Sequence, residues 1–104
     1  MRRRVVVTGL GCVSPVGNNV KDTWRALLAG RSGAAPITTF DASAHKTKFA
    51  AEVKGFAPEK YMDPKEARRR DRFEQFSIVS AKEALTQSGL QITEANAGRI
   101  GVII

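Results

Sequence analysis

The chain has 104 residues, the length of a single domain, and 42% of them are hydrophobic, as is typical of globular proteins. Its 17 Lys and Arg outnumber its ten Asp and Glu, giving a net charge of +7. This charge fits an acidic partner such as nucleic acid, anionic lipid or an acidic protein, and equally a basic part of a longer chain whose acidic residues lie elsewhere. The single cysteine excludes an internal disulfide and fits a reducing cytoplasm, and no apolar run approaches the ~20 residues that span a bilayer.

The first elements alternate between strand and helix. Residues 3–8 predict a buried strand, because Val5 to Val7 are apolar at consecutive positions, and this apolar run is too short for that of an export signal. A loop over residues 9–19 follows, because three glycines and Pro15 exclude regular structure. Asn18 or Asn19 caps the next helix, and Gly30 ends it. The helix carries an apolar stripe that we expect to be buried, formed by Val20, Trp24, Leu27 and Leu28.

The middle of the chain predicts one short strand and two helices. Residues 30–46 form a long segment without a regular pattern. The side chains alternate in character over residues 49–53, which predicts a half-exposed strand. Asp63 and Pro64 form a helix start, and Asp71 begins a second capping pattern eight positions later. The sequence therefore predicts a short helix over residues 64–69 and a longer one over residues 72–88, ended by Gly89.

The end of the chain favours a larger parent protein. The middle of the long helix is apolar or small around most of its circumference, which is typical of a helix inside a larger body. Residues 99–104 are rich in β-branched side chains and predict a buried strand. We therefore expect that the sequence is one part of a longer chain.

Three candidate sites are weighed against simpler interpretations. The run Thr8-Gly9-Leu10-Gly11 lacks the third glycine of a dinucleotide fingerprint, so we attribute its glycines to tight loop geometry. Cys12 has no neighbouring base and is interpreted as a small apolar loop residue. His45 is interpreted as a surface loop residue. One cysteine and one histidine offer no zinc site of recognisable spacing, and we expect no metal site.

A basic segment is the strongest candidate for a site. Residues 65–72 hold five cations and two carboxylates. At helical spacing Lys65, Arg68 and Arg69 share one face, which Arg72 can extend. Glu66 lies four residues before Arg70 and can neutralise it, which leaves the other cations free for an external anion. A solvated helical face explains most such runs, so both interpretations stay open at this level.

The order of motifs resembles the bacterial β-ketoacyl-[acyl carrier protein] synthases, the fatty-acid condensing enzymes, and especially the type II elongating synthases. The resemblance covers the whole chain and is carried by residues 5–18, 40–44, 47–50, 65–73 and 99–103. It implies a thiolase-like α/β fold, of which residues 1–104 are the N-terminal portion of the first half. It also implies a cytoplasmic homodimer that transfers an acyl chain to a cysteine and condenses it with malonyl-acyl carrier protein, without a cofactor.

The resemblance also assigns the site. In the type II synthases the matching basic helix contacts acyl carrier protein at the active-site entrance, and Lys65, Arg68 and Arg69 occupy those positions. Arg70 is an additional cation. The family's nucleophilic cysteine, its two histidines and its oxyanion donors lie further along the chain. We therefore expect no catalytic residue in this segment, no activity from the segment alone, and no nucleic-acid or membrane partner.

Two alternatives come from other classes. A catalytically silent relative, such as a chain-length-factor subunit, would share this amino terminus, and its deciding residue lies beyond position 104. A small basic nucleic-acid-binding module would explain the net charge of +7. Such a module needs aromatic residues interleaved with its cations, whereas Phe73 and Phe76 have the positions of core residues.

Overall fold

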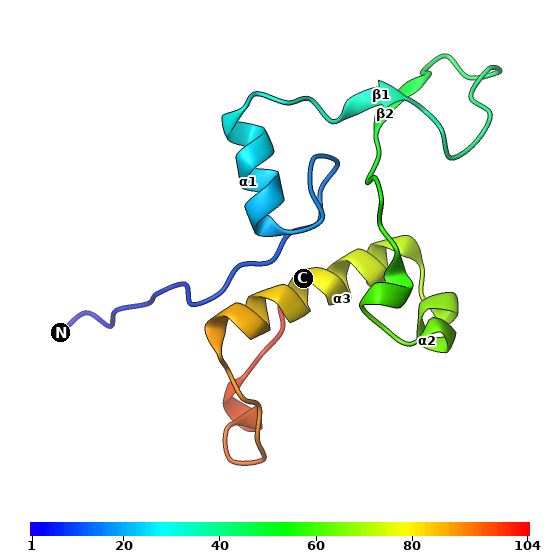
Figure 1. The fold of residues 1–104 in the computed structure, drawn as a ribbon. Coiled ribbons are helices and arrows are strands. Elements are labelled where there is room, and N and C mark those ends of the chain that lie inside the picture. Colours follow the sequence, from blue (N-terminus) through cyan, green and yellow to red (C-terminus); the bar gives the residue numbers. More distant parts are fainter.

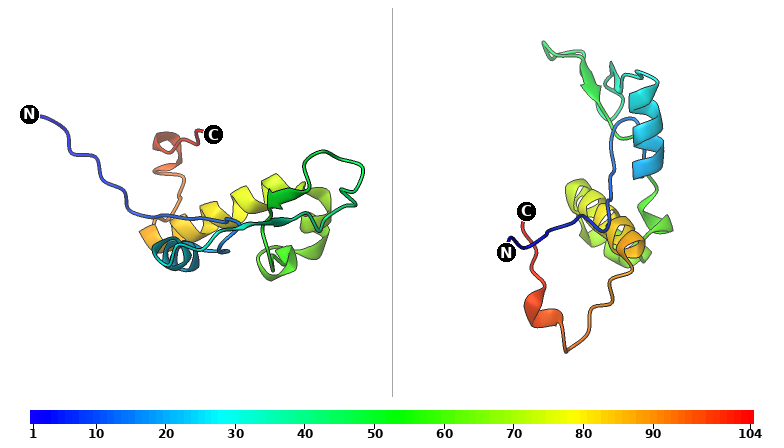
Figure 2. Two further views of the ribbon diagram at one scale, coloured as in Figure 1. Left: turned by 90° about the horizontal axis from the view of Figure 1, so that it is seen from above. Right: turned by 90° about the vertical axis from the view of Figure 1, so that its left-hand side faces the viewer.

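The computed structural model describes all 104 residues and shows an elongated molecule of 56 × 36 × 23 Å, in which six residues are buried. Figures 1 and 2 show one long helix, α3, crossing the middle, with α1 and a small hairpin on one side and the segment after α3 on the other. The elements are α1 (Val20–Leu28), β1 (Ala34–Pro36), β2 (Phe49–Ala51), η1 (Pro58–Lys60), α2 (Pro64–Arg69), α3 (Arg72–Ser88) and η2 (Ala97–Arg99). No helix combines the length and the apolar composition that a membrane crossing requires.

Helices α2 and α3 have the bounds predicted from their start signals, and the break between them is confirmed. The Asp63 carboxylate accepts a hydrogen bond from the backbone N–H of Lys65 at 2.8 Å, and the backbone of Arg70 is extended, which ends α2. Gly89 closes α3 in the left-handed conformation, at φ 69°. Asp71 occupies the predicted N-cap position of α3. The predicted capping hydrogen bond from its side chain is wrong, because the side chain makes none.

Helix α1 begins at the predicted cap but turns an unexpected face inward. The Asn19 side chain accepts a hydrogen bond from the N–H of Asp22 at 2.8 Å. The prediction of a buried apolar stripe is wrong, since Trp24 is 60% exposed while Thr23 is buried. Hydrogen bonds of Thr23 turn this face of α1 toward the loop, because its hydroxyl lies 2.9 Å from that of Ser14 and donates to the carbonyl of Gly17. Small and hydroxyl side chains therefore pack on the loop, and nothing in the chain covers the stripe.

The two strands predicted over residues 3–8 and 99–104 do not form in this structure. Residues 3–8 run outward as an extended segment (Figure 1), and residues 97–99 form η2, followed by irregular backbone. A strand requires the backbone N–H and C=O groups of a neighbouring strand, and neither segment has such a partner within these residues. Val5 and Ile103 are accordingly exposed.

The only sheet is an antiparallel hairpin in which Ala35 of β1 pairs with Ala50 of β2. The sequence predicted β2 but not β1, since Ala-Ala-Pro carries no strand pattern. Beyond β2, the carboxylate of Glu52 accepts hydrogen bonds from the backbone N–H groups of Thr38 at 3.0 Å and Thr39 at 3.2 Å, which closes the hairpin.

The side chain of Lys54 fastens the hairpin to the loop before α1. Its Nζ donates to three backbone carbonyls, those of Glu52 at 2.9 Å, Gly33 at 3.0 Å and Pro15 at 3.2 Å. In the other direction, the Asn18 side-chain amide donates to the carbonyl of Lys54 at 2.9 Å. The hairpin and the loop are therefore joined by hydrogen bonds in both directions, and Gly33 also lies close to Pro15 and Val16 of the loop.

The segment before α1 crosses α3 at very short range. A Cβ atom on Gly9 would overlap the carbonyl oxygen of Ala84, and one on Gly11 would overlap that of Ser80. Neither glycine has a positive φ angle, so the attribution to tight loop geometry is corrected: these glycines are needed because two backbones approach closely.

We predict that Gly11→Ala lowers the free energy of unfolding by about 1–3 kcal/mol, because the added methyl group forces the loop away from Ser80. Gly98→Ala is the matched control, since a Cβ there meets no atom within 4 Å and the change should stay within about 0.5 kcal/mol. Urea denaturation of the purified proteins measures both. Equal stability of the two variants would contradict the close approach.

Candidate functional site

The three cations singled out in the sequence lie on the solvent side of α2. Lys65, Arg68 and Arg69 are all exposed, and none of them has a carboxylate within 4.0 Å. Among these three side chains only that of Arg68 makes a hydrogen bond, from its Nε atom to the carbonyl of Pro64 in the same helix at 3.3 Å. The three positive charges are thus available to an anionic partner.

Arg70 is different, because carboxylates of the protein engage it. Its Nε atom donates to Oε1 of Glu66 at 2.8 Å, and its Nη1 atom lies 3.9 Å from a carboxylate oxygen of Glu74. The hydrogen bond and charge of Glu66 raise the pKa of Arg70 above its ordinary value. The predicted pairing of Glu66 with Arg70 is therefore confirmed, and Arg70 does not add to the free charge of the face.

Arg72 also stands apart from the three free cations. It begins α3 after the break, and its guanidinium lies over the rings of Phe76 at 5.0 Å and Phe56 at 5.5 Å. Such cation–π contacts engage the charge locally. The expectation that Arg72 extends the face of α2 is thus not supported by its position, and the face consists of Lys65, Arg68 and Arg69.

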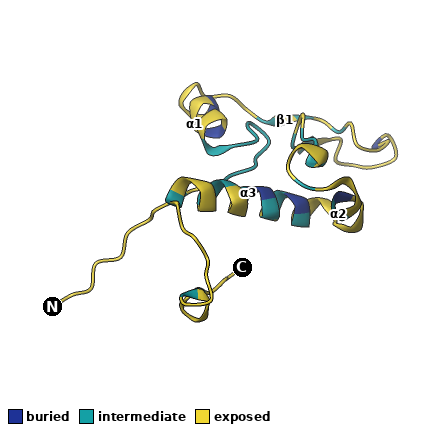
Figure 3. Cartoon of the chain, turned by 60° about the horizontal axis from the view of Figure 1, so that its bottom comes forward, coloured by how far each residue is buried: buried dark blue, intermediate teal, exposed yellow.

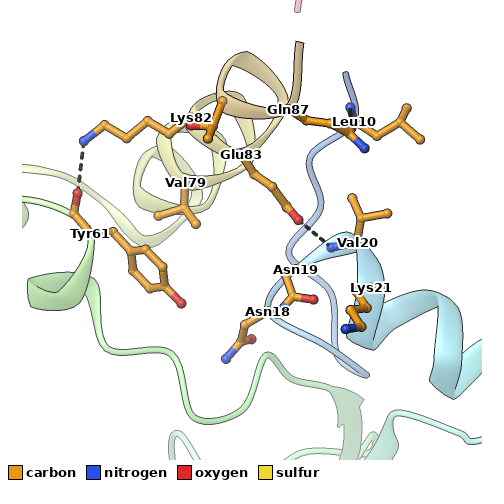
Figure 4. Close-up of a pocket in the computed structure, with 11 residues that line it drawn as sticks. Leu10, Asn18, Asn19, Val20, Lys21, Tyr61, Val79, Lys82, Glu83 and Gln87 are labelled. Atoms are coloured by element: carbon orange, nitrogen blue, oxygen red, sulfur yellow. Dashed lines mark hydrogen bonds between the residues drawn. The ribbon is translucent and has the colours of Figure 1, made fainter. Parts of the chain in front are cut away.

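The segment before α2 is fixed to α3 by aromatic packing. The ring of Phe56 stacks on Tyr61, with ring centres 5.6 Å apart, and meets the edge of Phe76 at 4.9 Å. Six residues further along α3, the Nζ atom of Lys82 donates to the carbonyl of Tyr61 at 3.0 Å (Figure 4). These contacts place η1, and with it the start of α2, against the first half of α3.

Glu83 of α3 holds the glycine loop and α1 together. Its Oε2 atom accepts from the backbone N–H of Cys12 at 3.0 Å, and its Oε1 atom accepts from the N–H of Val20 at 2.9 Å. Val20 is the first residue of α1, so the carboxylate also faces the positive end of that helix. One turn away, the Gln87 side chain accepts from the N–H of Leu10 at 2.6 Å.

A pocket of about 570 Å³ lies between α3, Tyr61 and the start of α1 (Figure 4). In Figure 4 the Glu83 side chain points toward Val20 and the Lys82 side chain toward Tyr61. Both charged groups are therefore engaged by backbone atoms, through the hydrogen bonds described above. The pocket presents no pairing of a nucleophile with a base.

The contacts of Cys12 and His45 are local. Cys12 is half-buried, with its Sγ atom 3.8 Å from the hydroxyl of Thr23, and it lines an apolar hollow of about 200 Å³ with Trp24. No basic side chain contacts it. His45 is exposed, and its ring meets the edge of Phe40 at 5.6 Å. No group of three His, Cys, Asp or Glu side chains is placed to hold a metal ion.

Sequence reasoning did not single out Gln75 and Glu83, although both make contacts between segments. Both belong to a row at four-residue spacing on α3, formed by Gln75, Val79, Glu83 and Gln87. Residues four apart lie on one helix face, and Val79 in that row is buried. Polar residues in register with a buried valine are the signal that could have identified this inward face.

Comparison with known proteins identifies the family. The family model for the N-terminal domain of β-ketoacyl synthases matches residues 2–104. The chain is 56% identical over 103 residues to the 3-oxoacyl-[acyl-carrier-protein] synthase 2 of Coxiella burnetii and 53% identical to that of Vibrio cholerae. Each alignment covers 99% of this chain and 25% of the relative, so the chain spans about a quarter of the length of these curated relatives.

A solved structure gives the same result for the fold. The structure described as the ishigamide ketosynthase/chain length factor matches with a TM-score of 0.78 and 37% identity, over 88% of this chain and 23% of that chain. The fold is therefore that of the N-terminal part of a ketosynthase, as the predicted thiolase-like α/β class requires. The chain belongs to the β-ketoacyl synthase family, and it is similar in sequence to enzymes named 3-oxoacyl-[acyl-carrier-protein] synthase 2.

We predict that Glu83→Gln lowers the free energy of unfolding by about 1–3 kcal/mol, because one of its two accepting oxygens becomes an NH₂ group facing a backbone donor. Glu94→Gln is the control, since Glu94 is exposed and its side chain makes no hydrogen bond or ion pair. Thermal and urea denaturation measure the difference. Similar losses in both variants would mean that the bridge contributes nothing specific.

Proposed function

We propose that residues 1–104 are the N-terminal portion of a type II β-ketoacyl-[acyl carrier protein] synthase, active in fatty-acid elongation as a cytoplasmic homodimer. In that reaction an acyl chain passes from its carrier thiol to a cysteine of the enzyme. Malonyl-acyl carrier protein then loses carbon dioxide, and the resulting carbanion attacks the acyl thioester and releases the cysteine. The names of the relatives and the family model support this proposal.

In this proposal the segment contributes scaffold and a docking surface for acyl carrier protein. The observation that carries it is the face of α2, where Lys65, Arg68 and Arg69 are exposed and free of carboxylates while Arg70 is paired with Glu66. The charge of +7 on the chain has the sign that an acidic carrier requires.

The physical demands of carrier delivery fit such a face. A carrier must associate rapidly, deliver its acyl group and leave, so long-range attraction is more useful than tight binding. Exposed ion pairs contribute only ~0.2–1 kcal/mol each but raise the association rate. The planar guanidinium groups of Arg68 and Arg69 can add paired hydrogen bonds to carboxylates.

A catalytically silent relative of the chain-length-factor type is the second candidate function. The likeness to a structure described as a ketosynthase/chain length factor favours it. A condensation assay of the whole protein separates the two, because a silent subunit forms no product alone whereas a synthase does. The nucleic-acid-binding alternative has no support from the family.

We predict that replacing Lys65, Arg68 and Arg69 together with alanine in the whole synthase lowers kcat/KM for carrier-bound substrates by a factor equivalent to ~1–3 kcal/mol. The defect should shrink as salt rises, since screening already weakens the wild-type contacts. Acylation by a small thioester without a carrier protein should stay nearly unchanged. Steady-state kinetics with both donors at several salt concentrations measures these effects.

The control for this experiment removes the same charge elsewhere. Lys21, Arg31 and Lys46 are exposed, their side chains make no hydrogen bond or ion pair, and they lie outside α2. Their triple alanine variant should retain carrier-dependent activity. A defect of equal size in the control, or equal losses with both donors, would refute the docking role of α2.

We also predict that the 104-residue polypeptide alone catalyses no condensation, because the family's reacting groups lie further along the chain. The purified segment is incubated with acyl- and malonyl-carrier protein, and product is measured by mass spectrometry. Condensation above background that disappears in Cys12→Ala would overturn this prediction and assign a reacting thiol to the segment.

A further inference from the structure

We infer that Gln75 is the positioning residue of the carrier-docking helix: its side-chain amide fixes the orientation in which α2 presents Lys65, Arg68 and Arg69. The inference rests on the proposed docking function of α2. Gln75 contacts the buried side of that helix, whereas the three cations lie on its exposed side.

Helix α2 is short, and its start is held by the contact with η1 and by the Asp63 cap. It spans six residues, and Ala67 is the single buried residue among them. The last carbonyls of a helix lack partners within the helix, so they must be satisfied from outside. The chain leaves the helical conformation at Arg70, and no glycine follows to form the usual closing turn.

Gln75 adds side-chain donors from the next helix at this end of α2, where the carbonyl of Ala67 also accepts from the backbone N–H of Arg70 at 3.2 Å. Its Nε2 atom donates to the carbonyl of Ala67 at 2.8 Å and to that of Arg70 at 3.2 Å. Because both neighbours are acceptors, only the NH₂ end of the amide fits this position. The side chain therefore closes the end of α2 and the link into α3 with one group.

Gln75 is buried, so its polar side chain needs hydrogen-bond partners within the protein. The residue is 7% exposed, and its Oε1 atom is buried without a hydrogen-bond partner. A buried polar atom without a partner is destabilising, so the two hydrogen bonds of Nε2 must offset the cost of the unsatisfied Oε1 atom. Figure 3 shows α2 lying beside the part of α3 that carries its buried residues.

The orientation of α2 decides where its charges point. The three cations lie on the side away from Ala67, and Gln75 anchors the backbone on the side of Ala67. A rotation or fraying of six residues would spread these charges without removing any. The expected consequence of losing the anchor is a weaker productive encounter with the carrier, while the chemistry stays unchanged.

The test uses Gln75→Met in the whole synthase, since methionine keeps the length of the side chain but cannot donate. We expect KM for carrier-bound substrate to rise about two- to fivefold, the size of one lost exposed ion pair, with kcat and small-thioester acylation unchanged. If Gln75→Met does not accumulate as folded enzyme, Gln75→Asn replaces it, because it keeps the amide and shortens its reach by one methylene.

Gln87→Met is the control, at an exposed glutamine further along α3. It makes the same substitution on the same helix and removes a hydrogen bond to the N–H of Leu10, far from α2 in sequence. Its melting temperature should fall while KM for the carrier substrate stays at the wild-type value. A rise in KM of equal size in both variants would show that Gln75 has only a general structural role.

Combining Gln75→Met with the triple alanine variant of α2 separates this inference from the proposed function. If Gln75 acts through the cations, adding Gln75→Met to that variant changes KM no further. Additive effects, or a carrier-selective defect in the triple variant without one in Gln75→Met and Gln75→Asn, would overturn the role of Gln75 alone. A triple variant without a carrier-selective defect would overturn both proposals.

Discussion

One carboxylate, that of Glu83, joins the loop before α1 and the start of α1 to α3. It accepts hydrogen bonds from the backbone N–H of Cys12, inside that loop, and from that of Val20, the first residue of α1. Backbone donors in a loop need partners, and this loop finds them on α3. The loop can reach this carboxylate only because Gly9 and Gly11 let its backbone lie directly on the helix. The two glycines and the carboxylate therefore act together to hold the loop on α3.

The same face of α3 serves two segments that are far apart in the sequence. Near its start Gln75 holds the end of α2, and further along Glu83 and Gln87 hold residues 10–20. Buried Val79 lies between these groups. Because a single rigid helix carries both sets of contacts, the basic face of α2 and the glycine loop have a fixed relation to one another. The orientation of a docking surface on the six-residue helix α2 is therefore fixed by its contacts with the longer helix α3.

The sequence predicted the parts of the fold that depend on local chemistry. Capping residues gave the start of α1 and the bounds of α2 and α3, since a cap acts within a few residues. The strands over residues 3–8 and 99–104 were wrong for this structure, because a strand depends on a partner that local pattern cannot supply. The three cations of α2 were found by spacing and charge, whereas Gln75 and Glu83 were missed because their role lies in contacts with distant backbone.

Lys54 shows that the two common cations are not equivalent at every position. Its three N–H bonds spread as the corners of a pyramid, and each finds a carbonyl from a different stretch of backbone. A guanidinium holds its donors in one plane and is longer, so it cannot reach three diverging oxygens at once. Arginine would keep the charge of this site and lose its geometry, and the hairpin would then be tethered to the loop by fewer bonds.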